Sequence, residues 1–222
     1  MRDALKHPAA LLVAAIVLLP LVVRPAIATE IWIFAIFGLG LNLLLGYTGL
    51  LSFGQSTFFG SAAYVAGWLL KYYGINVFFA LGIGVGVGAL SALIVGYLCV
   101  QRSGLYFIML TFALNQMFYF IAYQWTTVTG GEDGMPGVPR PAFLGIDFKD
   151  PLTYYAFVSA IFLLFLFVMK RIVESPLGKI LVAIRENDVR AGAVGFNVPR
   201  FKLLAFVIAG AFSGVAGVLY AM

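Results

Sequence analysis

Long apolar runs recur along the whole chain, separated by short polar stretches rich in glycine and proline. A helix needs about 20 apolar residues to cross the hydrocarbon core of a bilayer. By this length criterion the sequence predicts about seven transmembrane segments, at residues 9–24, 31–48, 52–71, 76–100, 104–125, 151–169 and 201–222. Only 10% of the residues are charged, against roughly 25% in soluble domains. We therefore expect an all-α, polytopic transmembrane helix bundle in which residues 1–222 form one membrane domain.

Charged residues gather in two of the polar stretches and orient the predicted bundle. Residues 170–202 carry seven lysines and arginines against three acids, whereas residues 126–150 carry two basic and four acidic residues. Positive charge marks the cytoplasmic side of membrane proteins. We therefore expect a cytoplasmic segment at about 170–200, an outer loop at about 126–150 and a cytoplasmic N-terminus. The basic residues form no stripe with exposed aromatics, so nucleic acid is not an expected partner.

The first thirty residues imitate a secretory signal, with a basic start, an apolar middle and small residues at Ala26 and Ala28. Arg24 and Pro25 sit where a cleavable segment should be neutral and extended, and a second apolar run follows at once. We expect an uncleaved first span, with a cleaved signal as the alternative.

No pattern of catalytic residues is present. His7 is the single histidine and lies in the basic N-terminal tail, and Cys99 is the single cysteine. The sequence contains no phosphate-binding glycine loop followed by Lys-Ser/Thr, and its outer acids Glu132 and Asp133 lack the spacing of a calcium loop. We expect a protein that is not an enzyme and that holds neither a metal nor a cofactor of its own.

The stretch GYTGLLSFGQSTFFG, at 46–60, is unusually polar for a membrane segment. Its glycines offer places where a helix can break, and Ser52, Gln55 and Ser56 follow at i, i+3 and i+4. Broken helices let transporters meet a zwitterionic substrate, because a helix N-terminus attracts a carboxylate. The candidate substrate pathway comprises Asn42, Gly46, Gly49, Ser52, Gln55, Ser56, Thr111 and Asn115. Hydrogen bonding between neighbouring helices is the alternative explanation for each of these polar residues.

Two pairs of glycines at four-residue spacing lie within GIGVGVG. Gly82 and Gly86 share one helical face and Gly84 and Gly88 share another. Each pair would let a neighbouring helix approach closely. We expect tight helix packing here, and a hinge is the alternative.

The segment 170–200 has internal order. Ser175 followed by Pro176 is typical of an N-cap and first helical residue, and apolar residues then recur with the period of an amphipathic helix. A second short helix is predicted at about 187–194, before the stop signals of Gly195 and the following residues. The residues alone leave two roles open, an interfacial helix lying on anionic lipid or a docking site for a partner.

Four blocks of the sequence, in order, resemble the membrane permease of branched-chain amino acid ABC importers, the LivM type. They are GLNLLLGYTGLLSFGQSTFFGSAAYVAG, GLYFIMLTFALNQMF, TGGEDGMPGVP and the final stretch that begins SPLGKILVAIRENDVRAGAVGF. The resemblance implies a bacterial inner-membrane importer in which this chain works with a companion permease of the LivH type, two cytoplasmic ATPases that use ATP and magnesium, and a soluble substrate-binding protein outside.

Position by position, the resemblance implies roles for two segments. The stretch RENDVRAGAVG is similar to the family's segment that couples to the ATPase, which implies that role for Arg185, Glu186, Asn187, Asp188, Arg190, Ala191, Gly192 and Gly195. Arg190 and Gly192 depart from the alanine and glutamate usual there. We expect the outer loop to contact the binding protein through Gly130, Gly131, Glu132, Asp133 and Gly134, and a merely solvated turn is the alternative.

The resemblance also frames the open questions of substrate and length. Family members continue beyond the block that ends this chain, so we expect a fragment of a longer permease, and a shortened permease is the alternative. The expected substrates are branched-chain or other hydrophobic amino acids moved by alternating access. The alternatives are urea or short amides in the same importer class, or a stand-alone channel or carrier without an ATPase.

Overall fold

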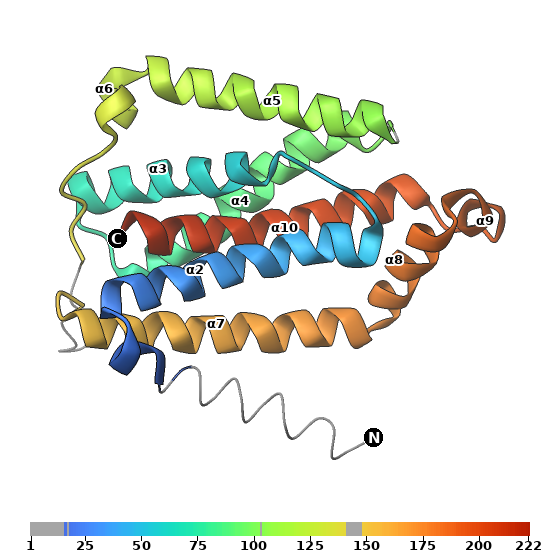
Figure 1. The fold of residues 1–222 in the computed structure, drawn as a ribbon. Helices are drawn as coiled ribbons and strands as arrows, with labels where there is room; N and C mark the ends of the chain where they lie inside the picture. Colours follow the sequence, from blue (N-terminus) through green and yellow to red (C-terminus); the bar gives the residue numbers. More distant parts are fainter. Residues whose placement is uncertain (1–15, 17, 103, 141–147) are drawn as a thin grey trace.

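The computed structural model describes residues 16, 18–102, 104–140 and 148–222, and every regular element within these ranges is helical. In chain order (Figure 1) they include α2 (Pro25–Asn42), the π-helix η1 (Leu43–Thr48), α3 (Gln55–Tyr73), α4 (Val77–Cys99), α5 (Leu105–Gln124), α6 (Thr126–Thr129), the 3-10 helix η2 (Gly131–Asp133), α7 (Pro151–Glu174), α8 (Pro176–Glu186), α9 (Asp188–Ala193) and α10 (Val198–Ala221). Half of the first predicted span, 9–24, lies outside the described residues.

Five of the described helices are long and apolar enough to cross a membrane, namely α2 with η1, α4, α5, α7 and α10. The predicted all-α, polytopic architecture is therefore confirmed, whereas the count of about seven spans is not. The helix α3 has 19 residues, but its polar start and Lys71 keep its hydropathy below that of the other five.

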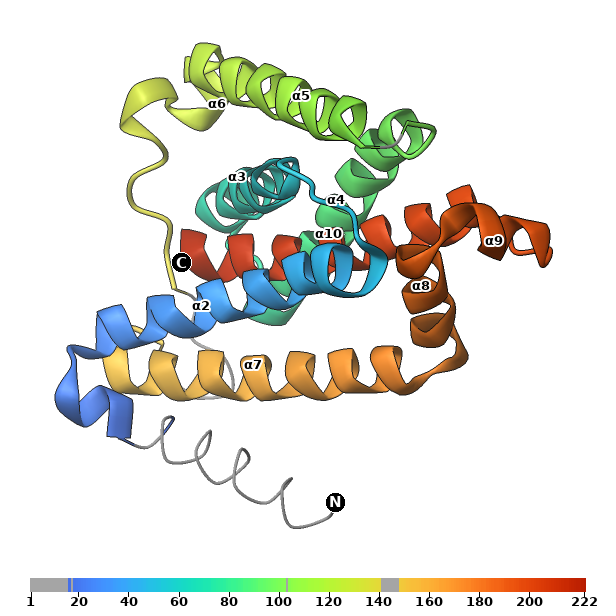
Figure 2. The ribbon, with the colours of Figure 1, turned by 45° about the vertical axis from the view of Figure 1, so that its right-hand side comes forward.

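Helix α10 forms the centre of the bundle and packs against α4, α3 and α2 (Figure 1). Helix α7 covers the other side of α2, while α5 lies beyond α3 and α4 (Figure 2). In α10, 67% of the most apolar window is buried, compared with 11% in α5. The core is therefore built around α10, and α5 is held to it by few contacts.

Close helix packing joins α4 to α10 through four glycines. A Cβ atom on Gly88 would lie 2.3 Å from the carbonyl oxygen of Gly210, and one on Gly214 would lie 2.1 Å from that of Gly84. Side chains at these positions would force the backbones apart. The predicted tight packing is therefore present on one of the two glycine faces, whereas Gly86 on the other face has no heavy atom within 4 Å of the Cβ position.

Helix ends follow local capping signals more closely than they follow hydropathy. Helix α2 begins at Pro25, six residues before the predicted span, because proline suits the first turn of a helix. The side chain of Asp150 accepts a hydrogen bond from the N–H of Thr153 at the start of α7, which then runs on to Glu174. The predicted cap at Ser175 is confirmed, since its hydroxyl accepts from the N–H of Gly178.

The two charged segments lie at opposite ends of the bundle (Figure 1). Helices α8 and α9 project at the end where α2 finishes and α10 begins, whereas α6, η2 and the start of α7 lie at the other end. This arrangement places the basic segment and the acidic loop on opposite sides, as the alternation of the predicted spans requires. Which side faces the cytoplasm stays a prediction.

Candidate functional site

The candidate site is centred on a break between two helices. The π-helix η1 finishes α2 and is closed by Gly49, whose φ of 73° lies in the left-handed region that favours glycine. No regular structure follows until α3 begins at Gln55. In both views the connecting segment runs back into the bundle, so that α3 starts between the two ends of α10 (Figures 1 and 2). A helix N-terminus therefore lies inside the apolar bundle, where its free N–H groups need partners.

Two hydroxyl groups hold the break in place. The buried Ser52 accepts a hydrogen bond from the N–H of Gly54 at 3.1 Å. The hydroxyl of Thr111, on α5, accepts from the N–H of Phe53 at 3.4 Å and donates to the carbonyl of Ile108. Both residues were predicted from sequence as pathway residues, and the structure gives them backbone partners at the break.

A second polar group joins α3 to α5. The hydroxyls of Ser56 and Thr57 each donate to the side-chain oxygen of Asn115 at 2.8 Å. Ser56 is exposed, Asn115 is half-buried and Thr57 is buried, so this group is accessible on the side of Ser56. Thr57 was not predicted from the sequence, because it lies one residue beyond the stripe at i, i+3 and i+4. Its place directly after Gln55 and Ser56 was the available signal.

Gln55 faces the other way, toward α10. Its side chain is 3% exposed, and its oxygen Oε1 accepts a hydrogen bond from the hydroxyl of Ser213 at 2.5 Å. Its amide nitrogen Nε2 is buried and has no hydrogen-bond partner among the described residues. An unsatisfied buried donor costs about 1–3 kcal/mol. The sequence analysis did not single out Ser213, which stands as a lone hydroxyl between the packed glycines of α10.

The predicted pathway residues therefore separate into groups. Gln55 contacts α10, while Ser56 and Asn115 join α3 to α5. No helix cap from a side chain covers the N-terminus of α3 between them. Asn42 is exposed on α2, and its side-chain oxygen lies over Gly46, where a Cβ atom would approach it to 2.3 Å. Nothing in the described contacts brings Asn42 to α3 or α5.

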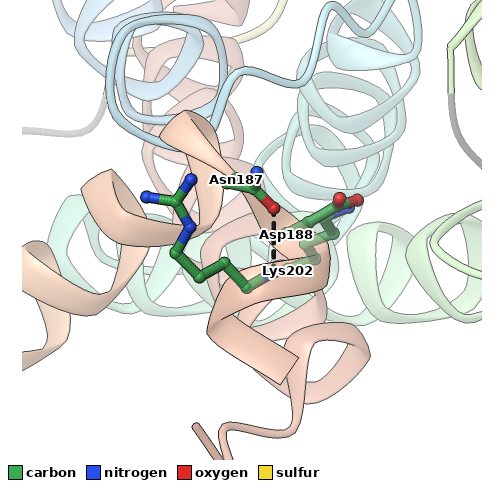
Figure 3. A network of polar contacts seen from close by, with 4 residues as sticks. Asn187, Asp188 and Lys202 are labelled. Carbon is green, nitrogen blue, oxygen red and sulfur yellow. Dashed lines mark hydrogen bonds and ion pairs between the residues drawn. The ribbon is translucent and has the colours of Figure 1, made fainter. Parts of the chain in front are cut away.

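The predicted coupling segment forms a compact projection at the basic end of the bundle. Asn187 separates α8 from α9, and its side-chain oxygen caps α9 by accepting from the N–H of Arg190 at 2.8 Å. The ammonium of Lys202 on α10 is largely buried and donates to Asp188 at 3.2 Å (Figure 3). This ion pair ties the displayed helix α9 to the central helix of the bundle.

The outward surface of this projection combines apolar and charged groups. Val189 and Val194 are exposed, at 78% and 74%. Val194 also borders a hollow of about 180 Å³, which is lined by Ala183, Glu186, Asn187, Arg190, Ala191, Val194 and Phe196. Four of the eight predicted coupling residues line this hollow, and the other four, Arg185, Asp188, Gly192 and Gly195, do not. Gly192 and Gly195 have open space at their Cβ positions.

Arg185 connects this projection to the helix break. It lies in the last turn of α8, and its guanidinium donates a hydrogen bond to the carbonyl of Gly46 in η1. Its stem lies against Gly49, where a Cβ atom would be 3.0 Å from the Cγ of Arg185. The predicted pathway and coupling segments therefore meet at this side chain.

The acidic loop at the opposite end takes its shape from glycines. Gly130, Gly131 and Gly134 all have positive φ, and Glu132 and Asp133 between them are exposed. The hydroxyl of Tyr123 donates to the carboxylate of Glu132 at 3.3 Å. The loop thus presents two acids on a fixed turn.

Comparison with known proteins gives one consistent result. The family described as branched-chain amino acid transport system / permease component matches residues 24–222. The high-affinity branched-chain amino acid transport system permease protein LivM of Salmonella typhimurium is 31% identical over 218 residues, which cover 88% of this chain and 51% of that protein. LivM of Escherichia coli matches equally well.

A more distant relative belongs to the other permease type. The probable branched-chain amino acid transport permease protein LivH of Methanocaldococcus jannaschii is 27% identical, over 82% of this chain and 60% of that protein. The chain spans about half the length of the two LivM proteins above. No solved structure matches it.

Proposed function

The chain belongs to the family of branched-chain amino acid transport permeases, and from this membership we propose that it is a membrane subunit of an ATP-driven importer. Its substrates are branched-chain or other hydrophobic amino acids, as the names of its relatives suggest. The chain sits in a bacterial inner membrane with its basic end toward the cytoplasm. It moves the substrate by alternating access and leaves ATP and magnesium to partner subunits.

The observation that carries this proposal is the start of α3 inside the bundle. The chain from 49 to 70 contains no charged residue, and the N-terminus of α3 has no side-chain cap. Its partial positive charge suits the carboxylate of an amino acid. The oxygens of Ser56 and Asn115, on the open side toward α5, suit the ammonium group. A neutral site of this kind selects a zwitterion with an apolar side chain without any formal charge of its own.

The surfaces at the two ends suit the remaining parts of an importer. The exposed valines, the hollow and the charged groups of α8 and α9 form a docking site for a cytoplasmic ATPase. The turn at Gly130–Gly134 presents Glu132 and Asp133 to an extracytoplasmic binding protein. The likeness to both LivM and LivH proteins supports a companion permease of the LivH type, with two ATPases completing the complex.

The proposal is tested by measuring the uptake of radiolabelled leucine into proteoliposomes. These contain the permeases with their ATPases and are supplied with the binding protein. Replacing Gln55 with alanine removes the buried Nε2 that has no partner among the described residues; at the first residue of α3, this donor is the group that we assign to the substrate carboxylate. We expect uptake per folded complex to fall about tenfold, the loss expected for one hydrogen bond to a charged group. Gln124→Ala, at the exposed end of α5, is the matched control and should leave uptake unchanged.

Ser213→Ala separates substrate contact from helix packing, because it removes the partner of Gln55 on α10. If Gln55 serves only to bond α10, the two alanine variants will lower stability alike and leave uptake per folded complex unchanged. That result would exclude Gln55 from the pathway. Uptake of urea in place of leucine would contradict the proposed substrate. Leucine uptake in the absence of ATP would contradict the proposal that the transporter is an ATP-driven importer.

A further inference from the structure

The side chain of Arg185 makes contact with both ends of a short segment that precedes the break. Its guanidinium donates to the carbonyl of Gly46, and its stem packs on Gly49. These two glycines are 139 and 136 positions earlier in the chain, so the contact is purely tertiary. It joins the last turn of a projecting helix to the last turn of a helix within the bundle.

The carbonyls at the end of η1 need partners that the helix itself cannot supply. The N–H of Leu50 donates to the carbonyl of Leu44 at 2.9 Å, and the hydroxyl of Thr48 donates to that of Leu43 at 3.0 Å. The carbonyl of Gly46 instead receives a charged donor from α8. A cation at the C-terminal end of a helix is also favoured by the helix dipole. Arg185 thus caps η1 from another element.

The element that Arg185 caps, η1, is a π-helix. The hydrogen bonds of a π-helix span five residues, against four in an α-helix, and such turns are found frequently at functional sites. If η1 returned to α-helical spacing, each residue of shift would rotate the following chain by about 100°. Such a change would reorient 49–54 and the start of α3. The bond to Gly46 stabilises the π arrangement, because it fixes the position of that carbonyl.

Helix α8 also contacts η1 through apolar side chains. Leu181 is fully buried in one cluster with Leu43, Leu44 and Leu50. Helix α9 follows α8 after the single residue Asn187 and is bound to α10 by Asp188. A displacement of α8 relative to α10 must therefore either carry η1 along or break the bond between Arg185 and Gly46.

We propose that Arg185 is a positioning residue that transmits movement of α8 and α9 to the helix break at 49–54. It does so by holding η1 in its π-helical arrangement in one state and releasing it in the other. This inference rests on the proposed docking of an ATPase at α8 and α9. It adds a specific connection between that docking site and the start of α3.

The experiment uses a cysteine at Leu51, an exposed apolar residue within the break. Its rate of modification by a small thiol reagent is measured in the complete complex in nanodiscs, with and without a non-hydrolysable ATP analogue. Cys99 is buried and contributes a constant background. Arg185→Met removes the guanidinium and keeps an apolar stem against Gly49. Lys179→Met is the matched control, because it removes an exposed cation from the same helix.

We expect the analogue to change the modification rate about tenfold in the parent and in Lys179→Met, which is the effect expected for one charge-assisted hydrogen bond. In Arg185→Met, which lacks this bond, the analogue should hardly change the rate. Arg185→Lys keeps the charge and should restore part of the change. An unaltered response in Arg185→Met would overturn the inference. A parent whose rate does not respond would overturn it too, because the break would then not follow the ATPase.

Two further measurements on the same preparations separate this inference from the proposed function. Copurification of the ATPases reports docking, and leucine uptake by the parent reports transport. If docking and uptake are present while Arg185→Met responds like the parent, the inference fails and the proposed function stands. If the parent neither binds ATPases nor takes up leucine, the proposed function fails as well.

Discussion

Among the glycines of α4, Gly88 is the one whose replacement with alanine should destabilise the bundle most. The new Cβ atom would lie 2.3 Å from the carbonyl oxygen of Gly210 and 2.8 Å from the Cα of Gly214. Ordinary van der Waals contact begins at 3.4 Å. Both neighbours are backbone atoms of the central helix α10, so no side-chain rotation can relieve the clash.

The expected magnitude follows from the separation that relief would require. The helices α4 and α10 must move apart by about 1 Å, and a gap of that size forfeits a quarter to a half of the dispersion attraction between the atoms that face each other. Overpacking of a well-packed core costs about 1–3 kcal/mol. Because the contact is with backbone, we expect a loss near the upper end, about 3 kcal/mol.

The matched control is Gly86→Ala, on the same helix, where no heavy atom lies within 4 Å of the new Cβ. Alanine is the better helix former by up to about 1 kcal/mol, so this variant should be as stable as the parent or more so. The free energy of unfolding of both variants is measured by titration with SDS in mixed micelles. Equal stability of the two variants would refute the close approach of α4 and α10.

Two other predictions concern the ends of the bundle. Asp188→Lys places a cation beside the largely buried Lys202 and should lower the free energy of unfolding by about 2 kcal/mol, between the values for exposed and fully buried pairs. The same variant should uncouple ATP hydrolysis from uptake. The double variant Asp188→Lys with Lys202→Asp should restore the free energy of unfolding. If it does not, the ion pair does not stabilise the contact between α9 and α10. Reversing the charges of Glu132 and Asp133 with lysines should weaken the apparent affinity for the loaded binding protein at least several-fold, with strong salt dependence. An unchanged affinity would place the binding protein elsewhere.

Much of the architecture was predictable because it depends on interactions local in sequence. The helix break between Gly49 and Gln55 follows from glycines spaced along an apolar run. The starts of α8 and α9 follow from Ser175 and Asn187, whose side chains bond the backbone three residues later. The sequence predicted a short helix at 187–194, and α9 spans Asp188–Ala193. Caps and breaks of this kind need no information about the rest of the fold.

Span boundaries were less accurate where hydropathy and capping disagree. The expected length of about 20 apolar residues per transmembrane helix placed the end of one span at 169. Helix α7 continues to Glu174, past Lys170 and Arg171. A helix ends where its backbone finds other partners, and charged residues do not stop it.

The sequence pointed to most of the polar residues near the helix break, but not to the partners that each of them contacts. Ser56 and Asn115 meet as a sequence pattern could suggest, with one hydroxyl and one amide on separate spans. Gln55 has the same spacing relative to Ser52 as an ordinary helical stripe, yet Ser52 lies outside α3 and Gln55 bonds Ser213. The direction of each side chain depends on where α3 begins and on which helix covers each face.

The sequence by itself determined the class of this protein, its helices, its break and the opposite charge of its two ends, because hydropathy, glycine placement and capping act over a few residues. Tertiary structure alone decided which glycine face of α4 meets α10, since Gly82 and Gly86 have the same spacing as Gly84 and Gly88. It likewise decided that Arg185 caps η1 at Gly46. Contacts between distant segments depend on how helices pack, and no local pattern encodes that choice.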